Sequence, residues 1–379
     1  TITGVITLLS IIGISKLQVE NSFINYFSKK TEIYKGMKLI DEKLGGTTPL
    51  DVIIDAPADF MKEYNKKVQN YNLENPDDPY EPALIDGYWF IHPRKEMKEI
   101  HNYLDSQDEL GKVISFDTTM EMARDLDPLA HNTIILGAME SKLPKDVSQM
   151  LFKSYVSEDG NQLRFNVRAY ETDKSLKRDE LLTRIKNHLI HDMGIDKDRV
   201  HLTGMMVMYN NVLQSLYDSQ IKTIWTVFIT IFVMFTILFK SPYIAGVAFL
   251  PNITITILVL GIMGWVGIPL DIMTITIAAI CTGSADDNTI HYIHRFRQEF
   301  AKTGDYWESI KAAHGTIGRA MYYTSITIML GFSILMFSNF VPTIYFGLLT
   351  AFAMLMAMLA NLVLLPLLLT LFKPINAKK

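Results

Sequence analysis

The sequence predicts an α+β membrane protein, in which a six-helix transmembrane bundle with a truncated first helix carries an extracytoplasmic α/β domain. Three observations lead to this prediction. The chain of 379 residues is 49% hydrophobic and only 20% charged, which is too apolar for most soluble enzymes. Residues 1–220 contain 34 acidic and 26 basic residues, whereas residues 221–379 contain only 6 and 10. Long uncharged runs fill the second part, as membrane-spanning helices require.

The same composition excludes several classes of protein. Such an apolar chain is not disordered, and its net charge of -4 does not suit a nucleic-acid-binding protein. A single cysteine, Cys281, permits no internal disulfide. The sequence has no phosphate-binding G-x-x-x-x-G-K-[ST] run and no nucleophile motif that stands out. We therefore expect neither an enzyme nor a bound cofactor.

Residues 1–15 are uncharged and apolar, and we interpret them as the end of a first transmembrane helix. Fifteen helical residues extend about 22 Å, which is short for a complete span. The charged start and cleavage site of a signal peptide are not visible. The alternative is a short buried helix that belongs to the soluble domain.

Residues 16–220 alternate β-like and helical runs, which predicts a water-facing domain of two split β-α-β units. The predicted strands are 50–54, 112–115, 163–170 and 200–203. The predicted helices are 94–105, 177–193 and 205–220, the last of which leads into the membrane. The proline- and aromatic-rich segment 70–93 predicts an inserted loop. It is either a surface for a substrate or partner, or a loop held by its own aromatic side chains.

Residues 221–372 predict five complete spans, separated by charges, prolines and polar turns. These are 222–239, 243–266, 270–292, 317–338 and 343–372. Lys and Arg concentrate in cytoplasmic loops of membrane proteins, and five of them lie in the loop 293–319, with three more after Phe372. We therefore expect this loop and the tail 373–379 to be cytoplasmic. The domain 16–220 then lies in the periplasm or outside the cell.

Asp286 and Asp287 lie inside a hydrophobic predicted helix. A carboxylate in the hydrocarbon region costs several kcal/mol unless it is solvated, paired or protonated. Burial and mutual repulsion favour the protonated form of at least one of them. Such a group can load and release a proton. The alternative is that the helix ends early and both carboxylates lie in the headgroup layer, since they lie about 24 Å along the helix from Leu270.

Helical spacing places further polar residues near this pair. Asp287 and His291 are four residues apart and share a helix face, which His294 extends, whereas Asp286 points about 100° away. The small residues 283–285 permit close helix approach. The hydroxyls of Thr324 and Ser325 and the amide of Asn361 come from the next two spans. We predict a proton relay made of Asp286, Asp287, His291, Thr324, Ser325 and Asn361.

Less specific interpretations of these residues stay open. The histidines near the cytoplasmic end are also typical of interfacial residues. The hydroxyls of Thr324 and Ser325 and the amide of Asn361 are also typical of ordinary hydrogen bonds between helices. A zinc site of Asp287, His291 and His294 would need a fourth ligand that the sequence does not offer. We therefore predict no metal site.

The residues now resemble a known family. Residues 283–291 read Gly-Ser-Ala-Asp-Asp-Asn-Thr-Ile-His, similar to the fourth-span signature of resistance-nodulation-division (RND) transporters. Residues 324–327, 346–350 and 364–366 are similar to motifs of later spans, and 44–50 and 202–204 to weaker motifs of the outside porter domain. The resemblance covers nearly the whole chain. It is closest to the MMPL-like (hydrophobe/amphiphile efflux-3) branch and to the C-terminal half of its members.

This resemblance implies proton-driven export of hydrophobic or lipid-like molecules across or out of a bacterial inner membrane, with protons as the coupling ion. Relatives have two such halves, so the implied partners are a missing N-terminal half, a second copy or a higher oligomer. Membrane lipids and periplasmic proteins are further implied partners. Asn361 lies where many relatives carry an acid, so the relay differs here. The rival interpretation is a sterol- or lipid-sensing or secretion-accessory protein on the same scaffold.

Overall fold

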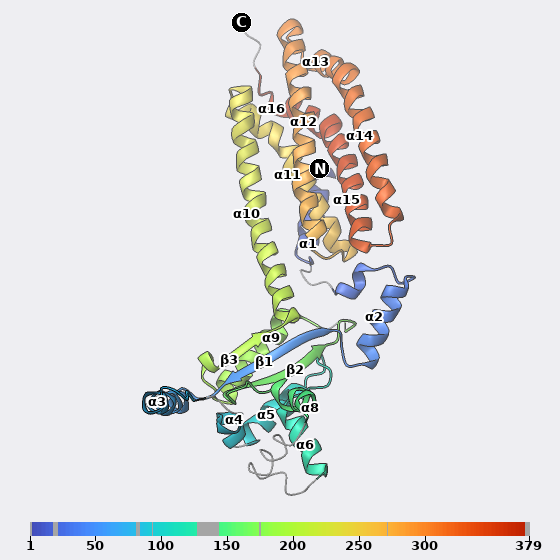
Figure 1. Ribbon diagram of the computed structural model, residues 1–379. Coiled ribbons are helices and arrows are strands. Elements are labelled where there is room, and N and C mark those ends of the chain that lie inside the picture. The colour runs from blue at the N-terminus through green and yellow to red at the C-terminus, as the bar shows by residue number, and fades with distance from the viewer. Residues whose placement is uncertain are drawn as a thin grey trace. The chain divides into compact units, whose positions relative to one another are not determined.

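A computed structural model describes residues 2–17, 22–80, 84–92, 94–126, 144–173, 176–270 and 272–375. The chain forms two compact units (Figure 1), each described separately below. The helical unit comprises Thr1–Tyr34 and Val212–Lys379, and the mixed unit comprises Lys35–Asn211. The predicted relay residues all belong to the helical unit.

A three-stranded antiparallel sheet forms the centre of the mixed unit. Its strands are β1 (Thr48–Asp55), β2 (Gln162–Ala169) and β3 (Val200–Thr203), in the order β2-β1-β3. Val52 lies opposite Phe165 on one side and Leu202 on the other. Alternate residues of β1 and β2 are buried, because successive side chains of a strand point to opposite faces.

Helices of the mixed unit bury the apolar face of this sheet. Met97, Ile100 and Leu104 of α5 (Arg94–Asp105) are buried at helical spacing and share one core with the strands. Helix α9 (Arg178–Asn187) adds Leu181 and Ile185 and ends in a π-turn, His188–Asp192. The remaining described helices of this unit are α2 (Glu32–Lys43), α3 (Ala58–Glu74), α4 (Tyr88–Ile91), α6 (Phe116–Leu126) and α8 (Lys145–Ser148).

The opposite face of the sheet is polar. The guanidinium of Arg164 on β2 donates to both carboxylate oxygens of Asp51 on β1, at 2.8 and 2.9 Å, and Asn166 donates to Asp51 at 2.8 Å. A sheet with one apolar and one solvated face is typical of antiparallel pairing.

The structure confirms three predicted strands and all three predicted helices of this region. Strands β2 and β3 both run antiparallel to β1 and are joined through α9, so they form one split β-α-β unit. The predicted strand 112–115 is wrong as a regular strand. This segment meets β2 only through isolated bridges at Leu110 and Ile114. Gly111, between these bridges, lies directly against the backbone of Gly45. The expected second unit is therefore not found among the described residues.

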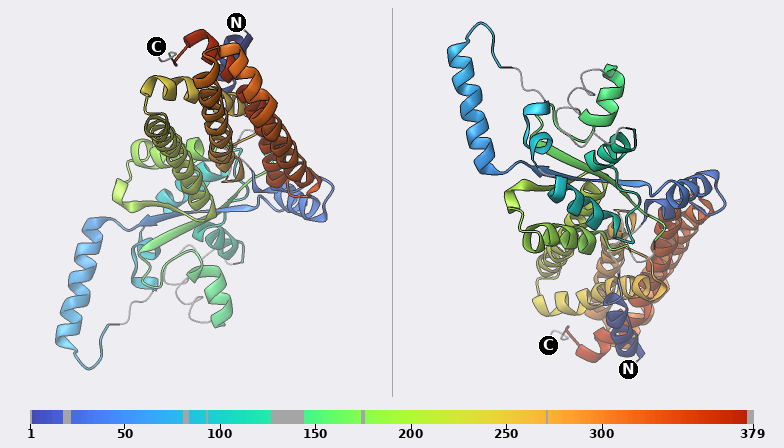
Figure 2. Two further views of the ribbon diagram at one scale, coloured as in Figure 1. Left: turned by 90° about the horizontal axis from the view of Figure 1, so that it is seen from above. Right: turned by 90° about the horizontal axis from the view of Figure 1, so that it is seen from below.

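The segment 70–93 is only partly the inserted loop that we predicted. Residues 70–74 are the last turn of α3, which buries none of its residues and extends from the mixed unit as a single helix (Figure 2). Tyr80 folds back so that its ring meets those of Tyr64 and Tyr71. Trp89 is buried and donates its indole N–H to the carbonyl of Ile54 at 3.1 Å. These contacts favour the interpretation of a segment held by its own aromatic side chains.

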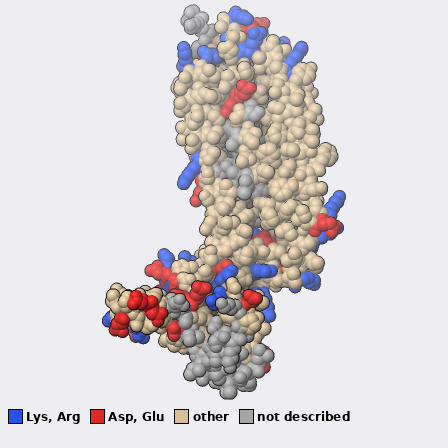
Figure 3. Space-filling model, viewed as in Figure 1, with Lys and Arg blue, Asp and Glu red and all other residues tan. Residues whose placement is uncertain are grey.

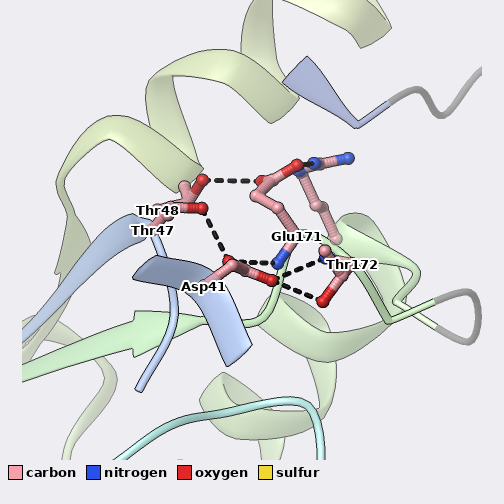
Figure 4. A network of polar contacts seen from close by, with 6 residues as sticks. Asp41, Thr47, Thr48, Glu171 and Thr172 are labelled. Atoms are coloured by element: carbon pink, nitrogen blue, oxygen red, sulfur yellow. Dashed lines mark hydrogen bonds and ion pairs between the residues drawn. The ribbon is translucent and has the colours of Figure 1, made fainter. Parts of the chain in front are cut away.

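A buried polar network joins α2 to the end of β2 (Figure 4). Asp41 is fully buried and accepts hydrogen bonds from the backbone N–H groups of Glu171 and Thr172 and from the hydroxyls of Thr47 and Thr172, at 2.6–3.0 Å. The carboxylate of Glu171 accepts from Thr48 and pairs with the equally buried Arg178 at 2.6 Å. Each buried charge of this network is therefore hydrogen-bonded, as burial requires.

Removing one charge of the buried pair should destabilise the mixed unit. Glu171→Gln leaves Arg178 buried without a carboxylate, so we expect the free energy of unfolding to fall by about 3–5 kcal/mol. Hydrogen exchange of the β2 amides in the full chain measures this loss. The control is Glu180→Gln, which breaks an exposed pair with Lys177 that is worth about 1 kcal/mol or less. Equal exchange rates in both variants would contradict the prediction.

The helical unit is built from α1 (Ile2–Ile14), α10 (Met205–Phe239), α11 (Pro242–Val266), α12 (Ile272–Thr303), α13 (Tyr306–Ala313), α14 (Arg319–Ser333), α15 (Val341–Leu359) and α16 (Leu365–Phe372). Among the described residues, four helices are long and apolar enough to cross a membrane: Met205–Phe239, Pro242–Val266, Tyr306–Phe337 and Val341–Phe372. The predicted helix 205–220 is confirmed and is continuous with the first of these.

The third of the five predicted complete spans, 270–292, is helical in the structure but continues to Thr303 as α12 and is not among those four helices. Its polar residues from Asp286 onward make it less apolar than the others. Asp271, which was expected at its start, lies outside the described residues. The count of six spans therefore stays a prediction, as does the assignment of α1 to the membrane.

Small residues bring α1 and α11 into very close contact. A Cβ added at Gly261 would overlap Ser10, and one at Gly264 would overlap the carbonyl oxygen of Gly13. The small residues are three positions apart on each helix, and small residues at a contact allow apolar helices to pack backbone against backbone. Trp265 adds an indole N–H bond to the carbonyl of Leu9 at 2.9 Å.

This contact should not tolerate a larger side chain. Gly264→Val must push α1 away from α11, and overpacking of this kind costs about 1–3 kcal/mol. We expect a lower midpoint of thermal unfolding in detergent. Gly246→Val is the matched control, because a Cβ there has nothing within 4 Å and the change in helix propensity is the same. Equal midpoints for the two variants would contradict this account of the contact.

Candidate functional site

The candidate site is a set of polar side chains on α12, which packs against α11 and α15. Asp286 is only 5% exposed, in a bundle whose other buried side chains are mainly aliphatic and aromatic. Because a buried carboxylate is costly without a partner, the arrangement of its neighbours decides what it can do.

Asn252 of α11 is the hydrogen-bond partner of Asp286. Its side-chain amide donates to a carboxylate oxygen of Asp286, and Asn252 itself is fully buried. It directly follows Pro251, which has no N–H to donate and so interrupts the hydrogen bonds of α11 at this level. Within the described residues, the Oδ1 atom of Asn252 has no hydrogen-bond partner.

One helical turn further along α12, a second buried contact crosses the bundle. The hydroxyl of Thr289 donates to Oδ1 of Asn361 at 2.7 Å, and both residues are fully buried. Asn361 lies in a π-turn, Ala360–Leu364, between α15 and α16. Such turns are frequent at functional sites, because they widen the helix and redirect a side chain.

Asp287 and His291 lie on a different face of α12. The predicted contact between them exists, with Nε2 of His291 3.4 Å from a carboxylate oxygen of Asp287. Their side chains are 75% and 64% exposed, so this pair does not point into the helical unit. His294 is exposed beyond them and lies 3.0 Å from the side-chain amide of Gln298.

The two hydroxyl side chains of α14 that we predicted for the relay have different surroundings. Thr324 is exposed and donates back to the carbonyl of Ala320 at 2.9 Å, which is an ordinary bond within a helix. Ser325 is fully buried, and its hydroxyl has no partner in the described part of the chain. Neither makes a described contact with Asp286 or Asp287. The expected close approach at Gly283 is also not seen, since a Cβ there has nothing within 4 Å.

Chemically, the arrangement can hold a proton on a carboxylate that is shielded from water and oriented by an amide. Among the described residues, no three His, Cys, Asp or Glu side chains come together as metal ligands would. Sequence reasoning missed Asn252, and it placed Thr289 near Asp286 without including it in the relay. The available signal for Asn252 was a polar amide directly after a proline within an uncharged run.

Asn252 and Asp286 should therefore be energetically coupled. In a double-mutant cycle of Asn252→Leu and Asp286→Leu, we expect a coupling free energy of about 1.5–3 kcal/mol, the usual range for a hydrogen bond to a charged group. Denaturant unfolding in detergent measures it. Thr254→Val on the same helix is the control, because Thr254 is half-buried and its described hydrogen bond goes to the carbonyl of Leu250 within α11. A coupling with Asn252 no larger than with Thr254 would contradict the assigned contact.

Comparison with known proteins also indicates a membrane protein, as the apolar helices of this unit do. The model of the MMPL family matches residues 96–377, which includes all of α12 and both helices that supply its buried partners. A protein of Methanocaldococcus jannaschii, whose name describes it as a membrane protein, is 24% identical over 375 residues. The match covers 96% of this chain and 87% of that relative.

Proposed function

Because the chain belongs to the MMPL family of membrane transporters, we propose that it exports hydrophobic or lipid-like molecules across or out of a bacterial inner membrane, driven by the proton motive force. The observation that carries this proposal is Asp286, a carboxylate buried in an apolar bundle and bound by the amide of Asn252. Ionisable residues inside a membrane are costly and usually functional. Packing alone gives no reason for a carboxylate at this position.

Loading and release of a proton at Asp286 is the proposed driving step. The charged form holds the amide of Asn252 tightly, because hydrogen bonds to ionised groups are the strong ones. Protonation removes the charge and weakens this bond, so α11 and α12 can repack. The proposed relay further includes Asp287, His291, Thr324, Ser325 and Asn361. The buried Thr289–Asn361 contact supports the role of Asn361.

The repacking must reach the mixed unit to move a substrate. Helix α10 is one continuous helix from Met205 to Phe239, so it links the two units covalently without a break. At its start, Met206 is part of the core of the mixed unit, and Arg178 lies over the ring of Tyr209 at 5.1 Å. We propose that α10 transmits the movement.

We further propose six spans, formed by α1, α10, α11, α12, α14 and the pair α15–α16. The mixed unit would lie in the periplasm or outside, and the loop 293–319 and the C-terminus in the cytoplasm. The distribution of charge supports this topology. In Figure 3 most of the described side of the helical unit is tan, apart from a red group on it, and Lys and Arg side chains gather at the end where α13 lies.

A second six-helix unit is the proposed partner. Asp287 is 75% exposed on a helix proposed to lie in the membrane, and a charged side chain facing lipid is strongly unfavourable. Another copy of this chain or a homologous half would cover that face. Native mass in detergent tests this point, and a strictly monomeric particle would contradict it.

The second candidate function is that of a lipid- or sterol-sensing or secretion-accessory protein on the same scaffold. The fold alone does not distinguish this function from transport. The buried Asp286 favours transport, because a sensor of lipid needs no carboxylate inside the bundle.

We expect Asp286→Asn to abolish proton flux while the protein stays folded, because an amide cannot release a proton. The measurement uses vesicles of phosphatidylethanolamine and phosphatidylglycerol with a trapped pH dye, an imposed pH gradient and a fluorescent phospholipid. Asp218→Asn, at an exposed acid on α10, is the control and should retain wild-type flux. Equal flux in the wild type and Asp286→Asn would refute the proton role and favour the sensing or accessory function.

A further inference from the structure

The buried polar face of α12 does not end at Thr289, the partner of Asn361. Asp286, Thr289 and Tyr292 follow one another at intervals of three residues, which places them about 4.5 Å apart along the helix axis. All three are buried. Beyond Tyr292 the same helix buries Ile293, Phe296 and Phe300 in an apolar cluster. Tyr292 therefore marks the last buried polar group on this face before the loop predicted to be cytoplasmic.

The hydroxyl of Tyr292 meets a histidine from that loop. It lies 2.8 Å from Nδ1 of His314, whose ring is perpendicular to the tyrosine ring. His314 is half-buried and begins the π-turn His314–Gly318 before α14. Tyr292 is fully buried, so the pair connects the interior of the bundle to its surface.

The surroundings of His314 suit a ring that takes up a proton. Its Nε2 lies 2.9 Å from the carbonyl oxygen of Leu362, and its Nδ1 lies 3.1 Å from that of Ile310. Carbonyl oxygens only accept, and a neutral imidazole has one N–H to offer, whereas an imidazolium has two. The neutral ring can instead accept the hydroxyl proton of Tyr292 at Nδ1. Both protonation states thus find partners in the same geometry.

The groups facing this ring are therefore Tyr292 from α12, the Ile310 carbonyl from α13 and the Leu362 carbonyl from the π-turn Ala360–Leu364. The cations nearest in sequence, Lys311 and Arg319, are both exposed. Leu362 directly follows Asn361, the partner of Thr289. The π-turn Ala360–Leu364 is therefore hydrogen-bonded both to Thr289 inside the bundle and to His314.

We propose that Tyr292 and His314 form the inner end of the proton route from Asp286. This inference rests on the proposed function. Protonated Asp286 gives its proton to water in the bundle and is left as a carboxylate. Tyr292 receives a proton from water on its inner side and passes its own hydroxyl proton to Nδ1 of His314. The imidazolium then releases one proton from its ring to cytoplasmic water, so one proton enters and one leaves.

The test uses the full-length protein in the phosphatidylethanolamine and phosphatidylglycerol vesicles described above. His314→Gln keeps hydrogen-bonding capacity but cannot titrate, and Tyr292→Phe keeps the ring but loses the hydroxyl. We expect each to lower Asp286-dependent proton flux at least tenfold. The matched controls are Tyr306→Phe, a partly buried tyrosine of the same apolar cluster, and His188→Gln, a histidine paired with Asp192 in the mixed unit. Both controls should retain wild-type flux.

The pH profile separates a proton carrier from a structural contact. In the wild type, flux should show a step with the pH of the receiving side, because the imidazole takes up and releases the proton there. This step should be missing in His314→Gln. Flux at wild-type level in both variants would overturn the inference, as would reduced flux that keeps the step. A wild type without Asp286-dependent flux would overturn the proposed function, and this inference with it.

Discussion

A charge buried among apolar helices is the constraint on which the arrangement of the helical unit depends. Asp286 is acceptable there only because α11 supplies the amide of Asn252. That bond fixes how α11 is rotated about its axis relative to α12. The contact of Thr289 with Asn361 then fixes the π-turn before α16 in the same way. In a bundle whose buried side chains are otherwise mainly apolar, these directed bonds help to specify which helix faces meet.

Buried polar contacts also determine the arrangement of the mixed unit near the start of α10. Its sheet and helices share an apolar core, but the ends of β1, β2 and α9 are joined by the buried pair of Glu171 and Arg178. Arg178 also lies over the ring of Tyr209 within the first turns of α10. The helix that leaves the unit is thus held by directed polar contacts as well as by packing. The start of α10 is therefore part of the folded core of the mixed unit.

Much of the fold could be predicted from the sequence, because periodicity and uncharged length report local structure. The strand at 163–170 and the helix at 94–105 were predicted for this reason. The strand at 112–115 was not correctly predicted, because regular pairing depends on distant residues, and this segment meets β2 only at an isolated bridge. At the site, Asp286 stands out in sequence, but Asn252 does not. A helix such as α11, which has no charge and few polar residues, has no polar face from which its rotation can be inferred.

The polar residues of α12 lie on two faces of the helix, one buried and one exposed. Asp286, Thr289 and Tyr292 are buried within the helical unit, whereas Asp287 and His291 are exposed on another face. Adjacent carboxylates therefore have opposite environments, although their sequence positions differ by one residue. Only the inner carboxylate is oriented by an amide of the same unit. The outer one projects away from this unit and lies beside His291, so the two carboxylates take part in separate contacts.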